Sequence, residues 1–206
     1  MHRYGLATRF RLHLAQVHTH DSTTEVNLPR REVAVLPLES EQFRHKQPSS
    51  DRQVATKRAF RDPLKFRRCL IPADAFYEWK RTGAAKQPYC FEVNEGELFA
   101  FAGLWDGWKD ANGNWTRTCS ILTTTPNAGT ASIHDRMPVI LSAESYDPWL
   151  DPGITNVRII SELLKPRDAK SMRYYAVSSR VNHVGNDDEE CSRPLEIAEV
   201  QPNLFR

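Results

Sequence analysis

Two short stretches contain the residue types that acid–base chemistry needs. Glu78 lies among the aromatic residues of the 76–79 segment, and His134 is followed by Asp135 and Arg136. A carboxyl group that loses water among aromatic rings has its pKa raised toward the range of a usable acid or base. A histidine beside an aspartate and an arginine can move protons or stabilise developing oxyanion charge. Glu78 and His134 therefore form a candidate acid–base couple.

Each of these residues also has a plainer interpretation. Glu78 could be a half-exposed strand glutamate beside Lys80, which is a common arrangement on protein surfaces. His134 could be a loop histidine that makes one structural hydrogen bond. Spacing in the sequence does not show whether the two side chains meet.

The stretch around Glu78 predicts two strands with a break between them. Residues 69–71 and 76–79 are apolar and flank Pro72-Ala-Asp-Ala75, where proline fixes φ and aspartate can bond its own backbone. Side chains alternate between the two faces of a strand. The alternation puts Phe76, Glu78 and Lys80 on one face, and Tyr77 and Trp79 on the other.

The remaining chain predicts further strands and two helices. Strands are expected at residues 89–93 and 98–105, joined as a hairpin by residues 94–97, and at 117–125, 137–141 and 173–177. One helix is expected over 143–150 with Ser142 as its cap, and a second before Pro166. The apolar face of the second helix would consist of Ile159, Ile160, Leu163 and Leu164. The predicted fold class is α+β, a mainly antiparallel curled sheet or partly closed β-barrel with peripheral helices.

The first sixty residues carry weaker patterns. Residues 9–17 favour an amphipathic helical run, 32–38 a short strand, and 39–57 a flexible loop, because that segment is charged and nearly lacks large apolar groups. His13, His18 and His20 have no carboxylate or cysteine at ligand spacing, so no metal site is expected. Residues 1–206 are expected to form a single domain.

Composition and charge limit the classes of protein. The net charge is only +2, but residues 1–68 hold fourteen Lys and Arg against seven Asp and Glu, and the remainder holds fourteen against nineteen. A basic N-terminal third would attract phosphates or other anions, or it is simply a solvated basic surface. No apolar run reaches transmembrane length, so no membrane partner is expected. The sequence has no glycine-rich phosphate loop, and no cofactor is expected.

The four cysteines lie far apart and form no Cys-x-x-Cys pair. This spacing argues against a zinc ribbon or a thioredoxin-type motif, and it favours reduced, buried thiols in a reducing, cytoplasmic compartment. The first twenty residues lack acidic side chains and include three arginines, which leaves an organelle transit segment as the alternative. The cysteines are Cys69, Cys90, Cys119 and Cys191.

Several motifs in series resemble the SOS response-associated peptidase (SRAP) family. The resemblance covers roughly residues 59–200, with residues 1–58 divergent. The motifs are Leu70-Ile-Pro-Ala-Asp-Ala-Phe-Tyr-Glu-Trp-Lys80, Gln87-Pro-Tyr89, Phe101-Ala-Gly-Leu-Trp105, Ile121-Leu-Thr-Thr124, Ile133-His-Asp-Arg-Met-Pro138, and Val177-Ser-Ser-Arg-Val-Asn182 with Asn186-Asp-Asp188.

The resemblance implies a function in the DNA damage (SOS) response. Members of that family bind single-stranded DNA containing abasic sites, crosslink to the lesion through a cysteine after the initiator methionine, and remove preceding residues by autoproteolysis. It implies that Glu78 and His134 match the catalytic glutamate and histidine. We also expect the protein to be a monomer. The positions that match residues near the DNA are Arg3, Trp79, Thr123 and Arg136.

The chemistry implied by the family explains these residue types. A ring-opened abasic sugar is an aldehyde, and an amine with an adjacent thiol condenses with it to a thiazolidine ring. The steps need proton transfers, which a carboxyl group and an imidazole can supply. Aromatic faces can stack exposed bases, and arginines neutralise phosphates.

The sequence departs from the family pattern at its start. The family begins Met-Cys-Gly-Arg, whereas this sequence reads Met1-His2-Arg3-Tyr4, and residues 47–53 replace the family's Asn-Ala-Arg-x-Glu-Thr motif. A shifted reading frame, a wrong start or a degenerate member would each account for the difference. The sequence as given therefore predicts weak binding without a stable crosslink. The alternatives are a non-catalytic single-stranded DNA-binding homologue and a peptidase that uses an internal cysteine.

Overall fold

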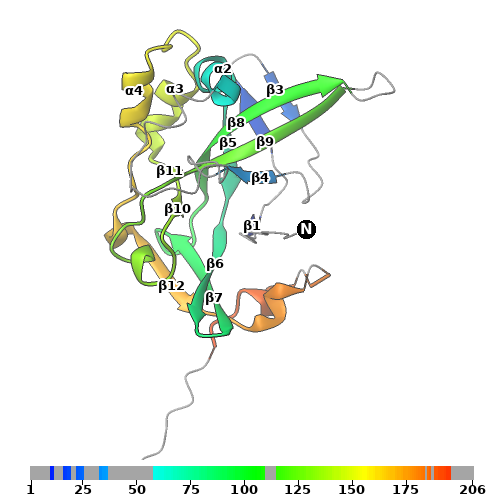
Figure 1. The fold of residues 1–206 in the computed structure, drawn as a ribbon, viewed down its shortest axis with the longest axis vertical. Helices are drawn as coiled ribbons and strands as arrows, with labels where there is room; N and C mark the ends of the chain where they lie inside the picture. Colours follow the sequence, from blue (N-terminus) through cyan, green and yellow to red (C-terminus); the bar gives the residue numbers. More distant parts are fainter. Residues whose placement is uncertain are drawn as a thin grey trace, which may run out of the picture.

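The structure is a computed structural model that describes most of the chain after residue 57 and four short segments before it (Figure 1). The described residues are 10–11, 16–19, 22–25, 33–36, 58–109, 115–183, 185–186 and 188–195. Side chains are described for residues 60–106, 119–183, 185–186 and 188–195. The segment at 39–57, predicted to be a flexible loop, lies outside this part of the chain.

The described strands form two sheets, and the smaller one carries Glu78. Its order is β1 (Phe10–Arg11), β6 (Ala75–Thr82), β7 (Ala85–Val93) and β12 (Met172–Ala176), and all neighbours are antiparallel. Gly83, with φ +62°, lies in the turn between β6 and β7, which is the left-handed conformation that glycine adopts readily. The sheet is therefore built around one hairpin with a short strand along each edge.

The larger sheet is also mainly antiparallel. Its path is β10 (Met137–Pro138), β9 (Trp115–Thr124), β8 (Phe99–Lys109), β5 (Arg68–Ala73), β2 (Gln16–Thr19) and β3 (Ser22–Glu25). In addition, β11 (Ile140–Leu141) pairs with β8, and β4 (Val33–Leu36) pairs in parallel with β9. The predicted α+β class with antiparallel sheets is confirmed. Within the described residues, neither sheet closes into a barrel.

The chain changes sheet twice where the sequence favours a local turn. β5 pairs with β8 and β6 with β7, so the break at Asp74 joins two sheets. The hairpin predicted across residues 94–97 is wrong, because β7 pairs with β6 and β12 while β8 pairs with β5, β9 and β11. Residues 94–96 make the tight turn with positive φ, but the strands on either side diverge to different partners.

The helices gather at one end of the molecule, over the larger sheet (Figure 1). They are α2 (Arg58–Phe66), α3 (Tyr146–Leu150) and α4 (Val157–Glu162). The helix predicted over 143–150 is confirmed as α3, which follows a 3₁₀ turn. The helix predicted before Pro166 is confirmed as α4. Ser142 makes no side-chain cap. Ile160 and Leu164 are buried, but Ile159 is 51% exposed and does not belong to the apolar face.

A buried arginine joins two of these helices to β5. The Arg68 guanidinium donates to the carbonyls of Leu64 and Lys65 at the end of α2, over 2.7 and 2.8 Å, and to the carbonyls of Trp149 and Asp151 at the end of α3. Carbonyls at a helix C-terminus lack partners within the helix, and a cation satisfies them well. Burial nevertheless lowers the pKa of Arg68 from its ordinary value. One side chain therefore satisfies C-terminal carbonyl groups of two helices.

The N-terminal segments differ from expectation. The helical run predicted for residues 9–17 is wrong, because Phe10–Arg11 and Gln16–Thr19 are strands β1 and β2. Each takes its hydrogen bonds from a strand far along the chain, β1 from β6 and β2 from β5 as well as from β3. Pairing with distant strands overrides a weak local periodicity. The strand predicted within residues 32–38 is confirmed as β4.

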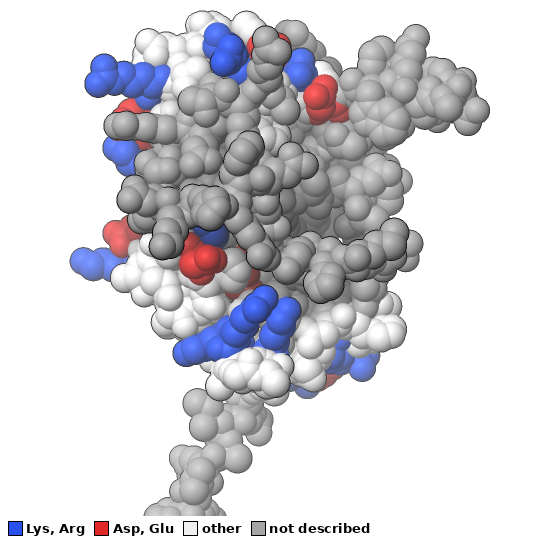
Figure 2. Space-filling model, in the orientation of Figure 1, with Lys and Arg blue, Asp and Glu red and all other residues white. Residues whose placement is uncertain are grey.

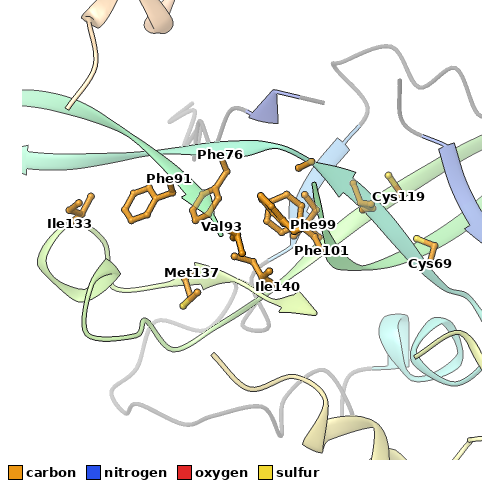
Figure 3. Packing of buried hydrophobic residues seen from close by; sticks show 13 residues of the cluster. Cys69, Phe76, Phe91, Val93, Phe99, Phe101, Cys119, Ile133, Met137 and Ile140 are labelled. Carbon is orange, nitrogen blue, oxygen red and sulfur yellow. The ribbon is translucent and has the colours of Figure 1, made fainter. Parts of the chain in front are cut away.

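An aromatic core joins the two sheets (Figure 3). Phe76 and Phe91 come from the smaller sheet, and Phe99 and Phe101 from the larger one; the ring centroids of Phe76 and Phe101 are 5.9 Å apart. Gly103 is required for close packing here, since a Cβ at this position would lie 2.7 Å from Cys69 Sγ and from Ile71 Cδ1. This core therefore sets how the Glu78 sheet lies on the rest of the protein.

Candidate functional site

Glu78 is buried on the inner face of the smaller sheet. Glu78 is 5% exposed, and its cross-strand partner on β7 is Tyr89. The predicted alternation is confirmed, because Phe76 packs in the aromatic core whereas Tyr77 and Trp79 pack on the opposite face of the sheet. The interpretation of Glu78 as a half-exposed surface glutamate is therefore wrong. A buried carboxyl group requires a hydrogen-bonding or functional role.

The loop that carries His134 is held by an asparagine. Asn127 Oδ1 accepts a hydrogen bond from the Thr130 N–H over 2.9 Å, and Asn127 Nδ2 donates to the Arg167 carbonyl over 2.8 Å. The 3₁₀ turn Thr130–Ser132 follows, and the N–H groups of Ile133 and His134 both donate to the Thr130 carbonyl. Sequence reasoning missed Asn127, although Pro126-Asn127 followed by Gly129 is a recognisable turn signal.

The His134 ring is oriented by its own loop. The Arg136 N–H donates to His134 Nδ1 over 3.1 Å, which places the proton of the neutral ring on Nε2. Asp135 Oδ1 and the Arg136 carbonyl oxygen also lie 3.2 Å from Nδ1 and can accept from it when the ring is protonated. Within the described part of the chain, Nε2 makes no hydrogen bond. Nε2 is therefore the ring nitrogen that can exchange a proton with a bound molecule.

Arg136 is attached to β9 through Thr123. One guanidinium nitrogen donates to the Thr123 carbonyl over 2.6 Å, and the group also approaches the Thr123 hydroxyl at 3.2 and 3.4 Å. Thr123 is buried and pairs with Pro138 across β9 and β10. Two of the four residues that the family resemblance placed near the DNA, Thr123 and Arg136, therefore contact each other. Strand β9 fixes the loop at the end that follows His134.

Glu78 and the His134 loop face the same apolar cluster. Phe76, two residues before Glu78 on the same face of β6, belongs to this cluster together with Ile133 and Met137, which bracket His134 in the chain. Figure 3 shows Ile133 beside Phe91, the residue that pairs with Phe76 across β6 and β7. The inner face of the smaller sheet is thus the face on which the loop packs. Direct contact between the side chains of Glu78 and His134 stays a prediction.

Trp79 points to the other side of the sheet. Its indole N–H donates to Asn182 Oδ1 over 2.7 Å, and its ring packs with the cluster that contains Tyr77, Val177 and Val181. Trp79 is therefore separated from Glu78 by the thickness of the sheet. Arg3, also predicted to contact DNA, lies outside the described residues.

The cysteines do not supply an accessible nucleophile. All four are buried, and none of them forms a disulfide. Burial, with a smaller contribution from Cys119, raises the pKa of the Cys69 thiol well above its ordinary value. A catalytic cysteine needs an accessible thiolate with a lowered pKa. The predicted burial of the thiols is confirmed, and it argues against a peptidase that uses an internal cysteine.

Basic side chains gather at the β6–β7 hairpin. Figure 2 shows Lys and Arg in the lower part of this face, where Figure 1 draws β6 and β7. Arg81 and Lys86 are direct cross-strand partners, and Lys80 is the residue before Arg81. Like charges placed opposite each other are unfavourable unless an anion or water relieves them. The hairpin, whose strand β6 carries Glu78, therefore offers a positive surface near that residue.

Among the residues described by the structure, no group of three His, Cys, Asp or Glu side chains could hold a metal ion. In the same part of the chain, no helix is long and apolar enough to cross a membrane.

Comparison with known proteins identifies the family. The family model described as SOS response associated peptidase (SRAP) matches residues 41–184. This chain belongs to the SRAP family. The match spans both sheets from β5 to β12 and includes Glu78, Trp79, Thr123, His134 and Arg136, whereas Arg3 precedes it.

Two curated relatives and one solved structure agree with this assignment. The SRAP chain is 46% identical over 138 residues to the abasic site processing protein YoqW of Bacillus subtilis, covering 66% of this chain and 62% of the relative. It is 32% identical over 177 residues to the abasic site processing protein HMCES of Gallus gallus, covering 76% and 52%. A crystal structure from Bacteroides thetaiotaomicron matches with TM-score 0.65 and 33% identity, covering 69% of this chain and 62% of that one. The chain spans less than two thirds of the length of these relatives.

Proposed function

We propose that this protein recognises abasic sites in single-stranded DNA. The observation that carries the proposal is the packing of the His134 loop on the face of the smaller sheet where Glu78 is buried. The names of the two curated relatives, both abasic site processing proteins, suggest the substrate. An acid–base couple beside cationic side chains suits a lesion that is an aldehyde within a phosphate backbone.

Each residue has a distinct role in this proposal. Glu78 and His134 transfer protons to and from the ring-opened sugar, with His134 acting through Nε2 because its Nδ1 is engaged by the loop. Arg136 neutralises a phosphate next to the lesion. Thr123 positions Arg136 through the hydrogen bonds to its guanidinium. Arg3 is proposed to contact the DNA as well. Trp79 lies on the outer face of the sheet, so it would contact only DNA that extends past the edge of the sheet to that face.

The covalent outcome depends on the group that attacks the aldehyde. An amine and the sugar aldehyde form an imine with loss of water, and an adjacent thiol then adds across the C=N bond to close a thiazolidine. His2 stands where the family has a cysteine, so a protein expressed from Met1 has no thiol at that position. Such a protein would form only a reversible imine. This observation favours a second candidate function, non-covalent binding of the lesion.

Equilibrium binding tests the recognition step. Fluorescence anisotropy would compare a labelled single strand with one central abasic site against the same strand with an intact base. We expect tighter binding to the abasic strand and a steep loss of affinity with salt, since phosphate contacts release counterions. Equal affinity for both strands would contradict lesion recognition, and no binding to either would contradict the proposed function as a whole.

A trapping assay tests the chemistry. Denaturing electrophoresis after incubation with the abasic strand, with and without borohydride, would separate a reducible imine from a thiazolidine. We expect a band only with borohydride, and Glu78→Gln and His134→Gln should slow its formation by roughly 100-fold or more. Glu162→Gln and His183→Gln are matched controls, because both side chains are exposed. A heat-stable band without reductant would show that the reasoning from His2 is wrong.

A further inference from the structure

Tyr174 is a large aromatic residue that the acid–base site leaves unused. It lies on β12, at the edge of the smaller sheet within the described residues, and is 41% exposed. Most large apolar side chains of the two sheets are buried in clusters, so an exposed ring on an edge strand is unusual here. Its neighbours show which face of the sheet it occupies.

The Tyr174 ring ends a stack of aromatic rings that crosses the sheet. Phe76 on β6 stacks on Phe91 on β7, with centroids 4.9 Å apart and an interplanar angle of 13°. Phe91 in turn stacks on Tyr174, at 5.2 Å and 26°. The three residues are also cross-strand partners in the sheet register. The stack fixes the plane of Tyr174 and buries one of its faces against Phe91.

This stack places Tyr174 on the same face of the sheet as Glu78. Tyr89, the cross-strand partner of Glu78, contacts Tyr174 edge to face with centroids 6.1 Å apart. Tyr174 is two strands across and two residues along from Glu78. With strands about 4.8 Å apart and about 3.3 Å per residue, the two Cα atoms are about 12 Å apart. That distance is on the order of three base-stacking steps of about 3.4 Å.

The start of the His134 loop lies next to the Tyr174 ring. A Cβ at Gly129 would lie 3.5 Å from Tyr174 Cε1 and 3.9 Å from Ala169 Cβ, so the start of the loop lies against the ring. The segment before β12 is basic, with Asp168 its only acidic residue between positions 165 and 171. Its cationic residues are Arg167, Lys170 and Lys165, the last of which pairs with Glu162. A partly exposed planar ring beside cations fits a nucleobase attached to a phosphate backbone.

We infer that Tyr174 stacks a base of the single-stranded DNA within a few nucleotides of the abasic site. The inference rests on the proposed function and extends it by naming a residue that positions the strand. The base stacks on the part of the Tyr174 ring that Phe91 leaves exposed, while the backbone passes the basic 165–171 segment. Stacking fixes the register of the strand and so directs the lesion toward Glu78 and His134.

Base-deletion scanning provides the test. Each single strand would carry the central abasic site and a tetrahydrofuran spacer in place of one further base. The spacer would occupy, in turn, each of the four positions on either side of the abasic site. Anisotropy would measure the affinity of the full protein for each strand. For the wild-type protein, we expect removal of one particular base to weaken binding about 5- to 100-fold, the usual size of a base–aromatic stack.

Variants at position 174 connect that base to the ring. Tyr174→Leu should weaken binding to the undeleted strand by the same factor and lose sensitivity to the deleted base, whereas Tyr174→Phe should behave like the wild type. Because no charge is removed, the salt dependence should stay unchanged. Leucine keeps an apolar side chain on Phe91, so the fold is retained. Ile159→Leu, at an exposed position of α4, is the control.

The outcomes separate the two claims. If the wild-type protein binds the abasic strand and Tyr174→Leu shows the same affinity and the same deletion profile, Tyr174 does not stack a base and the proposed function stands. If the wild type shows no preference for the abasic strand, the proposed function fails first and this inference fails with it. Equal weakening of the undeleted and all deleted strands would indicate lost packing rather than lost stacking, and would also overturn the inference.

Discussion

The Arg136 guanidinium donates a hydrogen bond to the main-chain carbonyl of Thr123 over 2.6 Å, and so ties the His134 loop to strand β9. The N–H of the same residue donates to His134 Nδ1 over 3.1 Å. Arg136 therefore positions the imidazole through its backbone and the loop through its side chain. Its own orientation depends on a buried threonine in a strand thirteen residues earlier.

The first prediction concerns this double attachment. Arg136→Lys keeps the charge but loses the planar fork that reaches both oxygens of Thr123. We expect the rate of imine trapping at an abasic site to fall roughly 10- to 100-fold, because a small displacement of a catalytic group is costly. Borohydride trapping under single-turnover conditions is the measurement.

Arg158→Lys on α4 is the matched control for Arg136→Lys, because its side chain is exposed. The melting temperature of Arg136→Lys should stay close to that of the wild type. A trapping rate equal to that of the control would contradict the positioning role of Arg136.

The second prediction concerns the stability of the helical layer. Arg68→Lys leaves several helix-end carbonyls without donors, since an ammonium group cannot span the ends of α2 and α3. We expect a loss of about 2–4 kcal/mol in the free energy of unfolding, as for other charged hydrogen-bond networks. Urea denaturation followed by tryptophan fluorescence measures it. Arg61→Lys, at an exposed position of α2, should change stability by less than about 0.5 kcal/mol; equal values for the two variants would refute the argument.

The third prediction is a dependence of stability on alkaline pH. The Tyr175 hydroxyl donates to Glu92 Oε1 over 2.7 Å, and burial followed by this hydrogen bond raises the pKa of Tyr175 above its ordinary value. Between pH 9 and 11 the unfolded chain releases the phenol proton while the folded protein keeps it. The stabilising contribution of Tyr175 is therefore complete below about pH 10 and declines as the pH rises further.

Comparison of wild type with Tyr175→Phe isolates that contribution. Near neutral pH, the variant should be less stable by about 1 kcal/mol, because Glu92 loses one donor but keeps Arg173. Above pH 10 the difference should shrink, as measured by urea denaturation at several pH values. A difference that stays constant from pH 8 to 11 would show that Tyr175 titrates alike in both states.

Local sequence patterns predicted much of the strand content and the faces of the key strand. The alternation of residues 76–79 placed Glu78 opposite Tyr77 and Trp79, and the structure confirms it, because a side-chain period of two is a property of a single strand. The strands at 33–36, 115–124 and 172–176 also follow from their own residues. The motifs around Glu78 and His134 indicated the SRAP family, which the family match confirms.

The pairing of these strands came only from the tertiary structure. Nothing in residues 94–97 shows that β7 and β8 enter different sheets, because the turn is compatible with either course and the hydrogen-bond partners lie elsewhere in the chain. The same holds for β1, where a weak helical pattern yields to pairing with β6. Backbone groups must find partners somewhere, and a local pattern cannot specify which distant strand supplies them.

The sequence by itself therefore determined the family and the face of β6 on which Glu78 lies, and it supplied the candidate site residues. Only the tertiary structure decided that Glu78 is buried, that Thr123 holds Arg136, and that Tyr174 completes an aromatic stack beside the loop. Residue type and strand alternation are local properties that a short window of sequence contains. Burial, guanidinium partners and ring stacking each join residues from separate strands, so they exist only once the sheets have packed.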